Sequence, residues 1–242
     1  AGGDLAKRKI IPALAHLAQR GHFSEHSRIV FAIRGPANLT EFLEEVDQFL
    51  EMAGDESSRK LLPGIAPYAC VCDLTLGSGD AKQTLDEAIQ GGPEPVVHYA
   101  ALPSARFKDL IDCLDEVRDP ARLRLVLEKP LGRNGAESAQ IEQVLSSKLD
   151  ESQIYRIDHY LGKQAVQNLL ALRLGNRIFE PLLTREHVAH IQITVAEDLG
   201  VEDRAGFYEN AGAIRDMIQS HILQMLAIVV MEPPVSMQAD SL

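Results

Sequence analysis

The sequence predicts an α/β fold with a mostly parallel sheet, followed by the start of an α+β domain with a large antiparallel sheet. Over the first 150 residues, short apolar runs of strand length alternate with helical patterns, which is typical of βαβ units. After residue 150 a strictly alternating stretch replaces them, and this period is typical of antiparallel sheets. We therefore predict two domains, 1–150 and 151–242.

The composition is that of an ordinary globular protein, with 45 % hydrophobic and 24 % charged residues among 242. No apolar run approaches the roughly 20 residues that a membrane-spanning helix needs, which argues against a membrane partner. A net charge of −11 argues against a nucleic-acid partner, because phosphate backbones bind basic faces. The three cysteines, two of them in a Cys-x-Cys spacing, indicate buried thiols in a reducing cytoplasm rather than disulfides or a zinc site.

The first domain divides into a regular series of elements. Apolar spacing predicts a helix over 3–20, with Pro12 as a local irregularity, and the β-branched run 28–34 predicts a strand. A second helix is predicted over 39–52, with Thr40 as its N-cap and one apolar face. Three further apolar runs of strand length and one helical pattern follow: 68–74, 96–102 and 124–129 as strands, and 105–118 as a helix.

The second domain begins with a different pattern. Residues 190–197 alternate, with Ile191, Ile193 and Val195 on one side of the predicted strand. This period predicts a half-buried strand, and a largely apolar helix over about 212–231 follows it.

The beginning of the chain offers a first candidate site. Gly2 and Gly3 precede the first helix, and adjacent glycines let backbone amides approach a pyrophosphate at a helix N-terminus. The alternative is an ordinary helix start after a surface turn. Where NAD-preferring proteins carry an acid, the strand 28–34 ends in Arg34, which suits the 2′-phosphate of NADP; a solvent-facing arginine is the alternative.

A second candidate lies at the end of the strand 124–129. Lys129 directly follows that strand and precedes Pro130, which can fix a turn through a cis bond. Ligands bind at the carboxyl ends of parallel strands, so Lys129 is a candidate ligand contact. The alternative is a strand-end lysine in solvent.

A third candidate is the stretch "RIDHYLGK" at 156–163. If a helix begins near Tyr160, His159 and Lys163 lie one turn apart and can hold a phosphate together with Tyr160. The alternative is a capped helix start with Asp158 as the N-cap. His221 occurs in a helix otherwise bound for the core; if it met Asp158, the pair would form a carboxylate-oriented general base.

These segments, in this order, closely resemble the glucose-6-phosphate dehydrogenase family. The resemblance runs through essentially the whole chain and covers about the first half of the family's length. Its segments are "GDLAKRKIIPAL" (3–14), "YAALP" (99–103), "LEKPLGR" (127–133), "YRIDHYLGKQAVQNLLALRLGNRIFEP" (155–181) and "GAIRDMIQSHILQML" (212–226). The third and fourth are the most specific.

The resemblance implies a role for each matching residue. His221 would be the general base for the C1 hydroxyl of the sugar, and Asp158 would orient it. Substrate contacts would come from Lys129, His159, Tyr160, Lys163, Glu197 and Asp216. Cofactor contacts would come from Gly3, Asp4, Leu5, Ala6, Lys7, Arg34, Tyr99 and Lys129, with no metal.

The resemblance also implies a Rossmann-like first domain and the oxidation of glucose 6-phosphate to 6-phosphogluconolactone with hydride transfer to NADP. This is the first step of the pentose phosphate pathway, expected in the cytoplasm and in a homo-oligomer, dimer or tetramer. The family's opening glycine is absent, and Gly2 stands where the family has serine. The family's first strand and the second half of its antiparallel sheet are also missing, so we expect an inactive piece of a longer enzyme. The alternatives are a hexose-6-phosphate dehydrogenase of the secretory pathway and a truncated chain without catalysis.

Overall fold

Five strands occur among the residues that the computed structural model describes, which are 1–35, 37–75, 80–89, 95–114, 123–132, 134–196, 209, 212–236 and 238. The strands are β1 (Ile29–Ile33), β2 (Ala69–Asp73), β3 (Val96–Ala100), β4 (Leu123–Glu128) and β5 (Ile154–Ile157). Backbone contacts divide the chain into two units, Ala1–Arg156 and Ile157–Leu242.

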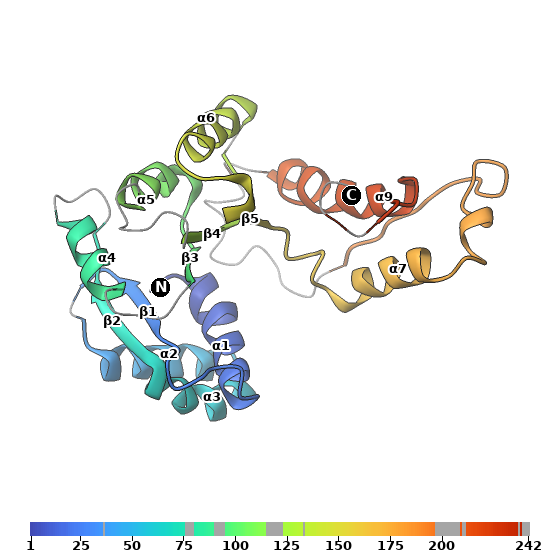
Figure 1. The fold of residues 1–242 in the computed structure, drawn as a ribbon. Helices are drawn as coiled ribbons and strands as arrows, with labels where there is room; N and C mark the ends of the chain where they lie inside the picture. The colour runs from blue at the N-terminus through green and yellow to red at the C-terminus, as the bar shows by residue number, and fades with distance from the viewer. Residues whose placement is uncertain are drawn as a thin grey trace. The chain divides into compact units, whose positions relative to one another are not determined.

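The strands of the first unit form two sheets (Figure 1). β1 and β2 pair in parallel, with Ile33 beside Asp73 at the end of the register. The other sheet has the order β3-β4-β5, and β3 and β4 are parallel, with Tyr99 beside Val126. Parallel pairing of strands that are separated by helices confirms the predicted α/β class.

Helices connect these strands and cover their faces. In the first half of the unit they are α1 (Ile11–Gln19), α2 (Leu39–Met52), α3 (Glu56–Leu61) and α4 (Ala81–Ile89). In the second half they are α5 (Phe107–Leu114) and α6 (Gly135–Ser146). Short 3₁₀ turns occupy Leu62–Tyr68, Ser104–Arg106 and Glu151–Gln153.

Each sheet has its own apolar core. Around β1, the rings of Phe31 and Phe42 lie 5.1 Å apart, and Val46 and Leu50 of α2 are fully buried beside them. This is the face that the sequence predicts for the helix over 39–52. The core of the other sheet consists mainly of buried side chains from β4 and α5: Leu123, Leu125, Leu127, Phe107, Leu110 and Ile111.

Two helix starts differ in detail from the sequence. The N-cap of α2 is Asn38, not Thr40, because the Asn38 side chain accepts hydrogen bonds from the amides of Thr40 and Glu41. The helix predicted over 3–20 changes geometry near Pro12, as expected. A π-helical turn spans Ala6–Ile10, and α1 continues from Ile11.

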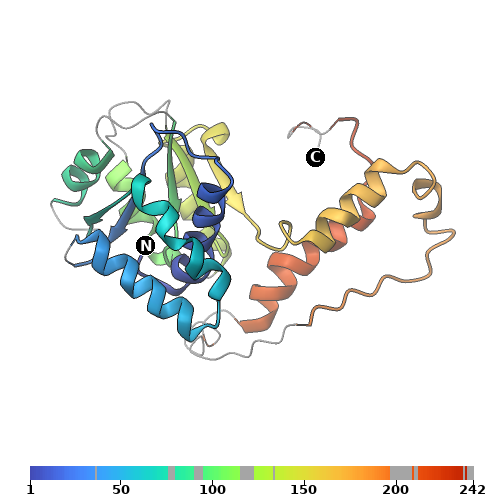
Figure 2. The same cartoon turned by 90° about the horizontal axis from the view of Figure 1, so that it is seen from below.

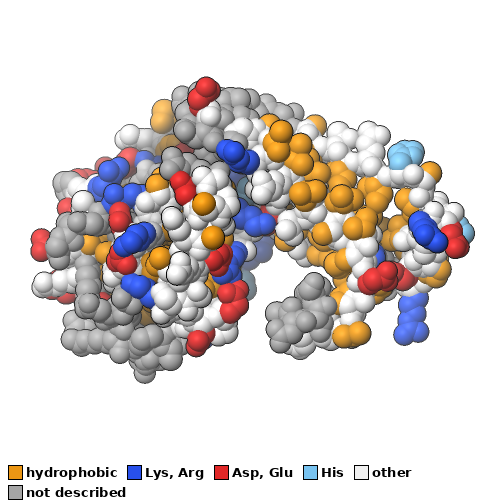
Figure 3. Space-filling model, turned by 90° about the horizontal axis from the view of Figure 1, so that it is seen from above, with side chains coloured by type: hydrophobic (Ala, Val, Ile, Leu, Met, Phe, Trp, Pro, Cys, Tyr) orange, Lys and Arg blue, Asp and Glu red, His pale blue; other side chains and the backbone are white. Residues whose placement is uncertain are grey.

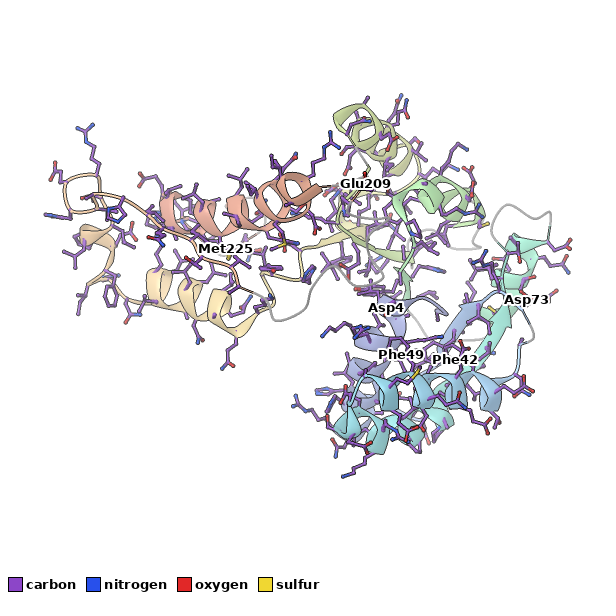
Figure 4. All side chains as sticks on the ribbon, turned by 180° about the vertical axis from the view of Figure 1, so that it is seen from behind. Asp4, Phe42, Phe49, Asp73, Glu209 and Met225 are labelled. Atoms are coloured by element: carbon purple, nitrogen blue, oxygen red, sulfur yellow. The ribbon has the colours of Figure 1, made fainter. Side chains whose placement is uncertain are left out.

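The second unit is built on two helical segments that lie side by side (Figures 1 and 2). One is α7 (Gln164–Gly175). The other is a π-helical segment, Ile214–Ile222, that continues into α9 (Leu223–Val230). A 3₁₀ turn at Glu180–Leu182 follows α7. Met225 lies between α9 and α7 (Figure 4).

A buried arginine ties the two helices of this unit together. Arg173, in the last turn of α7, is 4 % exposed. Its guanidinium donates to the carbonyl oxygens of Ile228 and Met231, at the end of α9. A cation at a helix C-terminus also complements the helix dipole, so Arg173 fixes α9 against α7.

Apolar side chains are exposed over much of the second unit (Figure 3). They include Leu172, Ile178, Phe179, Leu182, Ile191, Ile214, Ile218, Leu223 and Val230. No helix among the described residues has both the length and the apolar character to cross a bilayer.

The strand predicted at 190–197 is wrong for the residues that are described there. Residues 190–196 have no regular secondary structure. The alternation survives in burial, since Ile193 and Val195 are half-buried whereas Gln192 and Thr194 are exposed. A strand requires a neighbour for its amides and carbonyls, and none pairs with this segment among residues 157–196 and 212–236. The antiparallel sheet predicted for this domain therefore has no strand in those ranges.

Candidate functional site

The stretch 158–163 forms a tight turn between β5 and α7. Asp158 Oδ1 accepts the Tyr160 amide at 2.9 Å, and the Asp158 carbonyl accepts the Leu161 amide at 3.0 Å. The Lys163 amide then donates to the Tyr160 carbonyl at 3.0 Å, and α7 begins only at Gln164. The condition of a helix start near Tyr160 is therefore not met, and neither is the alternative of Asp158 as an N-cap, because the Asp158 side chain stabilises a turn instead of capping a helix.

The turn brings Asp158 to His221, 63 residues later in the chain. Asp158 Oδ1 lies 2.7 Å from His221 Nδ1, and both side chains are almost completely buried. Because an ionised carboxylate only accepts hydrogen bonds, Nδ1 carries the proton of this contact. Nε2 is then the basic nitrogen of the neutral ring, and the carboxylate fixes the ring's orientation.

Aromatic and cationic groups of the turn surround this pair. The Tyr160 ring stacks on the His221 ring at 4.2 Å between centroids, and the His159 ring meets it edge-on at 4.7 Å. Lys163 Nζ lies 3.7 Å from the centroid of the Tyr160 ring. The Tyr160 hydroxyl is directed to Met217 Sδ, at 3.9 Å. Three predicted phosphate contacts and the predicted base thus form one cluster within the second unit.

The other three residues predicted to contact substrate lie outside this cluster of side chains or outside the described residues. Asp216 is half-buried in the same π-helical segment as His221, and π-helical turns are frequent at functional sites. Lys129 directly follows β4 in the first unit, and its bond to Pro130 is cis. Glu197 lies outside the described residues.

The glycine turn at the start of the first unit has open space above it. The Lys7 amide donates to the carbonyl of Gly3 at 3.2 Å, so the amides of Asp4, Leu5 and Ala6 precede this donor at the start of the helix. A Cβ atom added to Gly2 or Gly3 would meet no other atom within 4 Å. Unpaired amides and free space above a helix start fit the pyrophosphate of a dinucleotide.

Two charged residues of this turn form ion pairs, one with α2 and one within the same helix. Lys7 is 9 % exposed and forms an ion pair with Glu45 of α2, near the Phe49 ring. Asp4 pairs with Arg8, one turn along the helix, at 3.1 Å (Figure 4). In this structure the Lys7 ammonium therefore attaches the turn to α2.

The other predicted cofactor contacts lie at strand ends. Arg34 is exposed just after β1. Tyr99 of β3 donates its hydroxyl to Glu128 Oε1, at the end of β4. Burial, together with the Glu128 carboxylate, raises the pKa of Tyr99 well above its usual range, so the phenol stays protonated and keeps this hydrogen bond.

Sequence reasoning missed two contacts of these sites. Glu128 immediately precedes Lys129, and its position at the strand end was the signal that could have identified it. Met217 lies one turn before His221 on its helix, and nothing in its local sequence indicates a contact with Tyr160.

Comparison with known proteins gives consistent family matches along the chain. Residues 1–168 match the family model described as "Glucose-6-phosphate dehydrogenase, NAD binding domain". Residues 170–242 match the model described as "Glucose-6-phosphate dehydrogenase, C-terminal domain". The matched ranges adjoin shortly after the turn that holds Asp158.

Individual proteins and solved structures similar to this chain belong to the same family as the two matching models. The glucose-6-phosphate 1-dehydrogenase of Rhizobium meliloti is 40 % identical over 99 % of this chain and 50 % of its own length. A crystal structure of the Mycobacterium avium enzyme has a TM-score of 0.86 and 32 % identity, covering 99 % of this chain and 52 % of its own. A glucose-6-phosphate dehydrogenase in complex with glucose-6-phosphate has a TM-score of 0.81 and 30 % identity, covering 99 % of this chain and 51 % of its own.

The chain spans about half the length of the curated relatives it matches. It belongs to the glucose-6-phosphate dehydrogenase family.

Proposed function

We propose that the full-length protein oxidises glucose 6-phosphate at C1 to 6-phosphogluconolactone, with hydride transfer to NADP, as the first step of the pentose phosphate pathway. The observation that carries this proposal is the 2.7 Å contact between His221 Nδ1 and Asp158 Oδ1, beside the cluster of His159, Tyr160 and Lys163. Family membership supports the same reaction.

His221 acts as the general base. Its Nε2 removes the proton of the C1 hydroxyl as the hydride leaves C1, and the imidazole becomes an imidazolium. Asp158 holds the ring in one tautomer and stabilises the positive charge that forms. Burial of both side chains strengthens this stabilisation, because little water screens the pair.

The turn before α7 holds the substrate phosphate. Lys163 and His159 supply cationic and N–H donors within one turn of chain, and such charge-assisted bonds are short and strong. Tyr160 supports them with its ring and adds a contact of its own to the phosphate. Glu197 and Asp216 are proposed to bind sugar hydroxyls, and Lys129 to contact both substrate and cofactor.

The first unit holds the cofactor. NADP supplies the nicotinamide C4 that accepts the hydride. The amides of Gly3, Asp4, Leu5 and Ala6 bind its pyrophosphate, assisted by the helix start. Lys7 anchors the turn, Arg34 contacts the 2′-phosphate, and Tyr99 contacts the nicotinamide nucleotide.

The same proposal extends to the setting of the enzyme. The full-length protein acts in the cytoplasm as a homo-oligomer, dimer or tetramer, with glucose 6-phosphate as its small-molecule partner. The net charge of −11 is unsuited to a nucleic-acid partner.

Kinetics of two variants test the proposed mechanism. In the full-length protein, His221→Asn should lower kcat by about 10²–10⁴-fold with little change in KM, because a general base acts in the transition state. Asp158→Asn should also lower kcat, because the amide no longer stabilises an imidazolium. The assay is the absorbance of reduced nicotinamide with glucose 6-phosphate and NADP. A large rise in KM at unchanged kcat for His221→Asn would instead make this histidine a binding residue.

A further inference from the structure

Asp73 lies at the end of β2, where that strand runs beside β1 (Figure 4). Its Oδ1 accepts the backbone amide of Gly35 at 3.1 Å. Gly35 has a φ of +112°, a conformation that side chains disfavour, and a Cβ there would meet no atom within 4 Å. The carboxylate of β2 thus holds the turn that follows β1, and the space above that turn is open.

The same turn carries Arg34, the residue assigned to the 2′-phosphate. Arg34 and Asp73 are both exposed, and no ion pair between them occurs among the described residues. A cation and an anion therefore lie at neighbouring strand ends, with Arg34 directly after β1 and Asp73 at the end of β2. A phosphate bound by Arg34 would be attracted by one and repelled by the other.

The backbone amide adds a second effect. Phosphates bind readily to exposed amides of a turn, and the Gly35 amide is the one next to Arg34. Asp73 already accepts from that amide, so the amide is not available to a phosphate oxygen while this hydrogen bond is made. A ribose with free hydroxyls needs no such amide, because a hydroxyl can donate to a carboxylate.

We propose that Asp73 determines cofactor selectivity by weakening the binding of a 2′-phosphate, so that the site accepts NAD as well as NADP. This inference rests on the proposed function, since it concerns the nicotinamide cofactor of that reaction. In this proposal the Asp73 carboxylate repels the 2′-phosphate that the Arg34 guanidinium attracts.

The test is calorimetric titration of the full-length protein with NADP⁺ and, separately, with NAD⁺. Asp73→Asn is the informative variant, because the amide oxygen still accepts from Gly35 while the charge is lost. We expect about five- to tenfold tighter binding of NADP⁺ and a change below about twofold for NAD⁺. Glu44→Gln, which removes another exposed carboxylate, on α2, is the matched control and should leave both affinities unchanged.

Asp73→Ala removes both the charge and the hydrogen bond from the Gly35 amide, so comparison with Asp73→Asn separates these two effects. Improved NADP⁺ affinity relative to NAD⁺ in both Asp73 variants supports selectivity by charge. If the ratio of the NADP⁺ and NAD⁺ affinities in Asp73→Asn equals that of the wild type, the inference is overturned, whether both affinities stay the same or change by the same factor. Turnover of glucose 6-phosphate by the wild type is measured alongside, so that failure of the proposed function is seen separately from failure of the selectivity.

Discussion

His98 gives a pH dependence of stability that can be worked from the structure. It lies in the middle of β3, beside the fully buried Leu125 of β4, and its Nε2 is buried without a hydrogen-bond partner among the described residues. Burial lowers the pKa of His98 to about 4. The pKa of an unfolded histidine is about 6.5. Below that pH the unfolded chain binds a proton at His98, whereas the folded chain does not until the pH approaches about 4.

The difference between the folded and unfolded pKa of His98 sets the sign and size of the pH effect on the free energy of unfolding. The stability that neutral His98 allows is fully present above about pH 6.5 and is lost as the pH falls toward about 4. At about 1.4 kcal/mol per pKa unit, the whole effect is about 3 kcal/mol, of which about 2 kcal/mol is lost between pH 8 and pH 5. His98→Phe keeps a ring of similar size but cannot bind a proton, so it should lose this part of the acid sensitivity.

The assay is urea unfolding of the full-length protein, followed by circular dichroism at about pH 8 and about pH 5. The loss of unfolding free energy on acidification should be about 2 kcal/mol smaller in His98→Phe than in the wild type. His26→Gln, which replaces a histidine whose side chain is 79 % exposed, should behave like the wild type. An identical acid-induced loss in His98→Phe and the wild type would refute the reasoning.

Three further predictions concern other parts of the protein. Lys163→Ala should raise the KM for glucose 6-phosphate about tenfold or more with a smaller effect on kcat, since it removes a cation proposed to bind the phosphate; unaltered steady-state kinetics would exclude Lys163 from that role. Arg173→Met should lower the unfolding free energy by about 3 kcal/mol, because it leaves carbonyls at the end of α9 unpaired; denaturant unfolding checks this, and a neutral result would contradict it. Gly132→Ala should cost about 2 kcal/mol or more in the same assay, because φ is +95° and the added Cβ would lie 2.8 Å from Ser138 N. The matched Gly135→Ala, whose Cβ would meet nothing within 4 Å, should be neutral or slightly stabilising.

The sequence was sufficient for the elements whose signal is local. The runs at 28–34 and 124–129 form β1 and β4, because β-branched and apolar residues of strand length have few other stable arrangements. The apolar face of α2 was also predictable, since its spacing repeats every turn.

Features that depend on distant or competing partners were not predictable. Asn38 and Thr40 are both good N-caps, and only the backbone path into α2 decides between them. Alternation at 190–197 indicates a strand, but strand formation requires a neighbour that local sequence cannot supply. The approach of His221 to Asp158 spans 63 residues, so sequence could offer the pair only as a hypothesis.

One oxygen atom has two tasks in the turn before α7. Asp158 Oδ1 receives the Tyr160 amide and also the His221 imidazole. The turn proposed to bind the substrate phosphate and the His221 ring proposed to deprotonate C1–OH are therefore held by the same carboxylate oxygen. A shift of this turn on phosphate binding would therefore also move the carboxylate oxygen that orients the His221 ring.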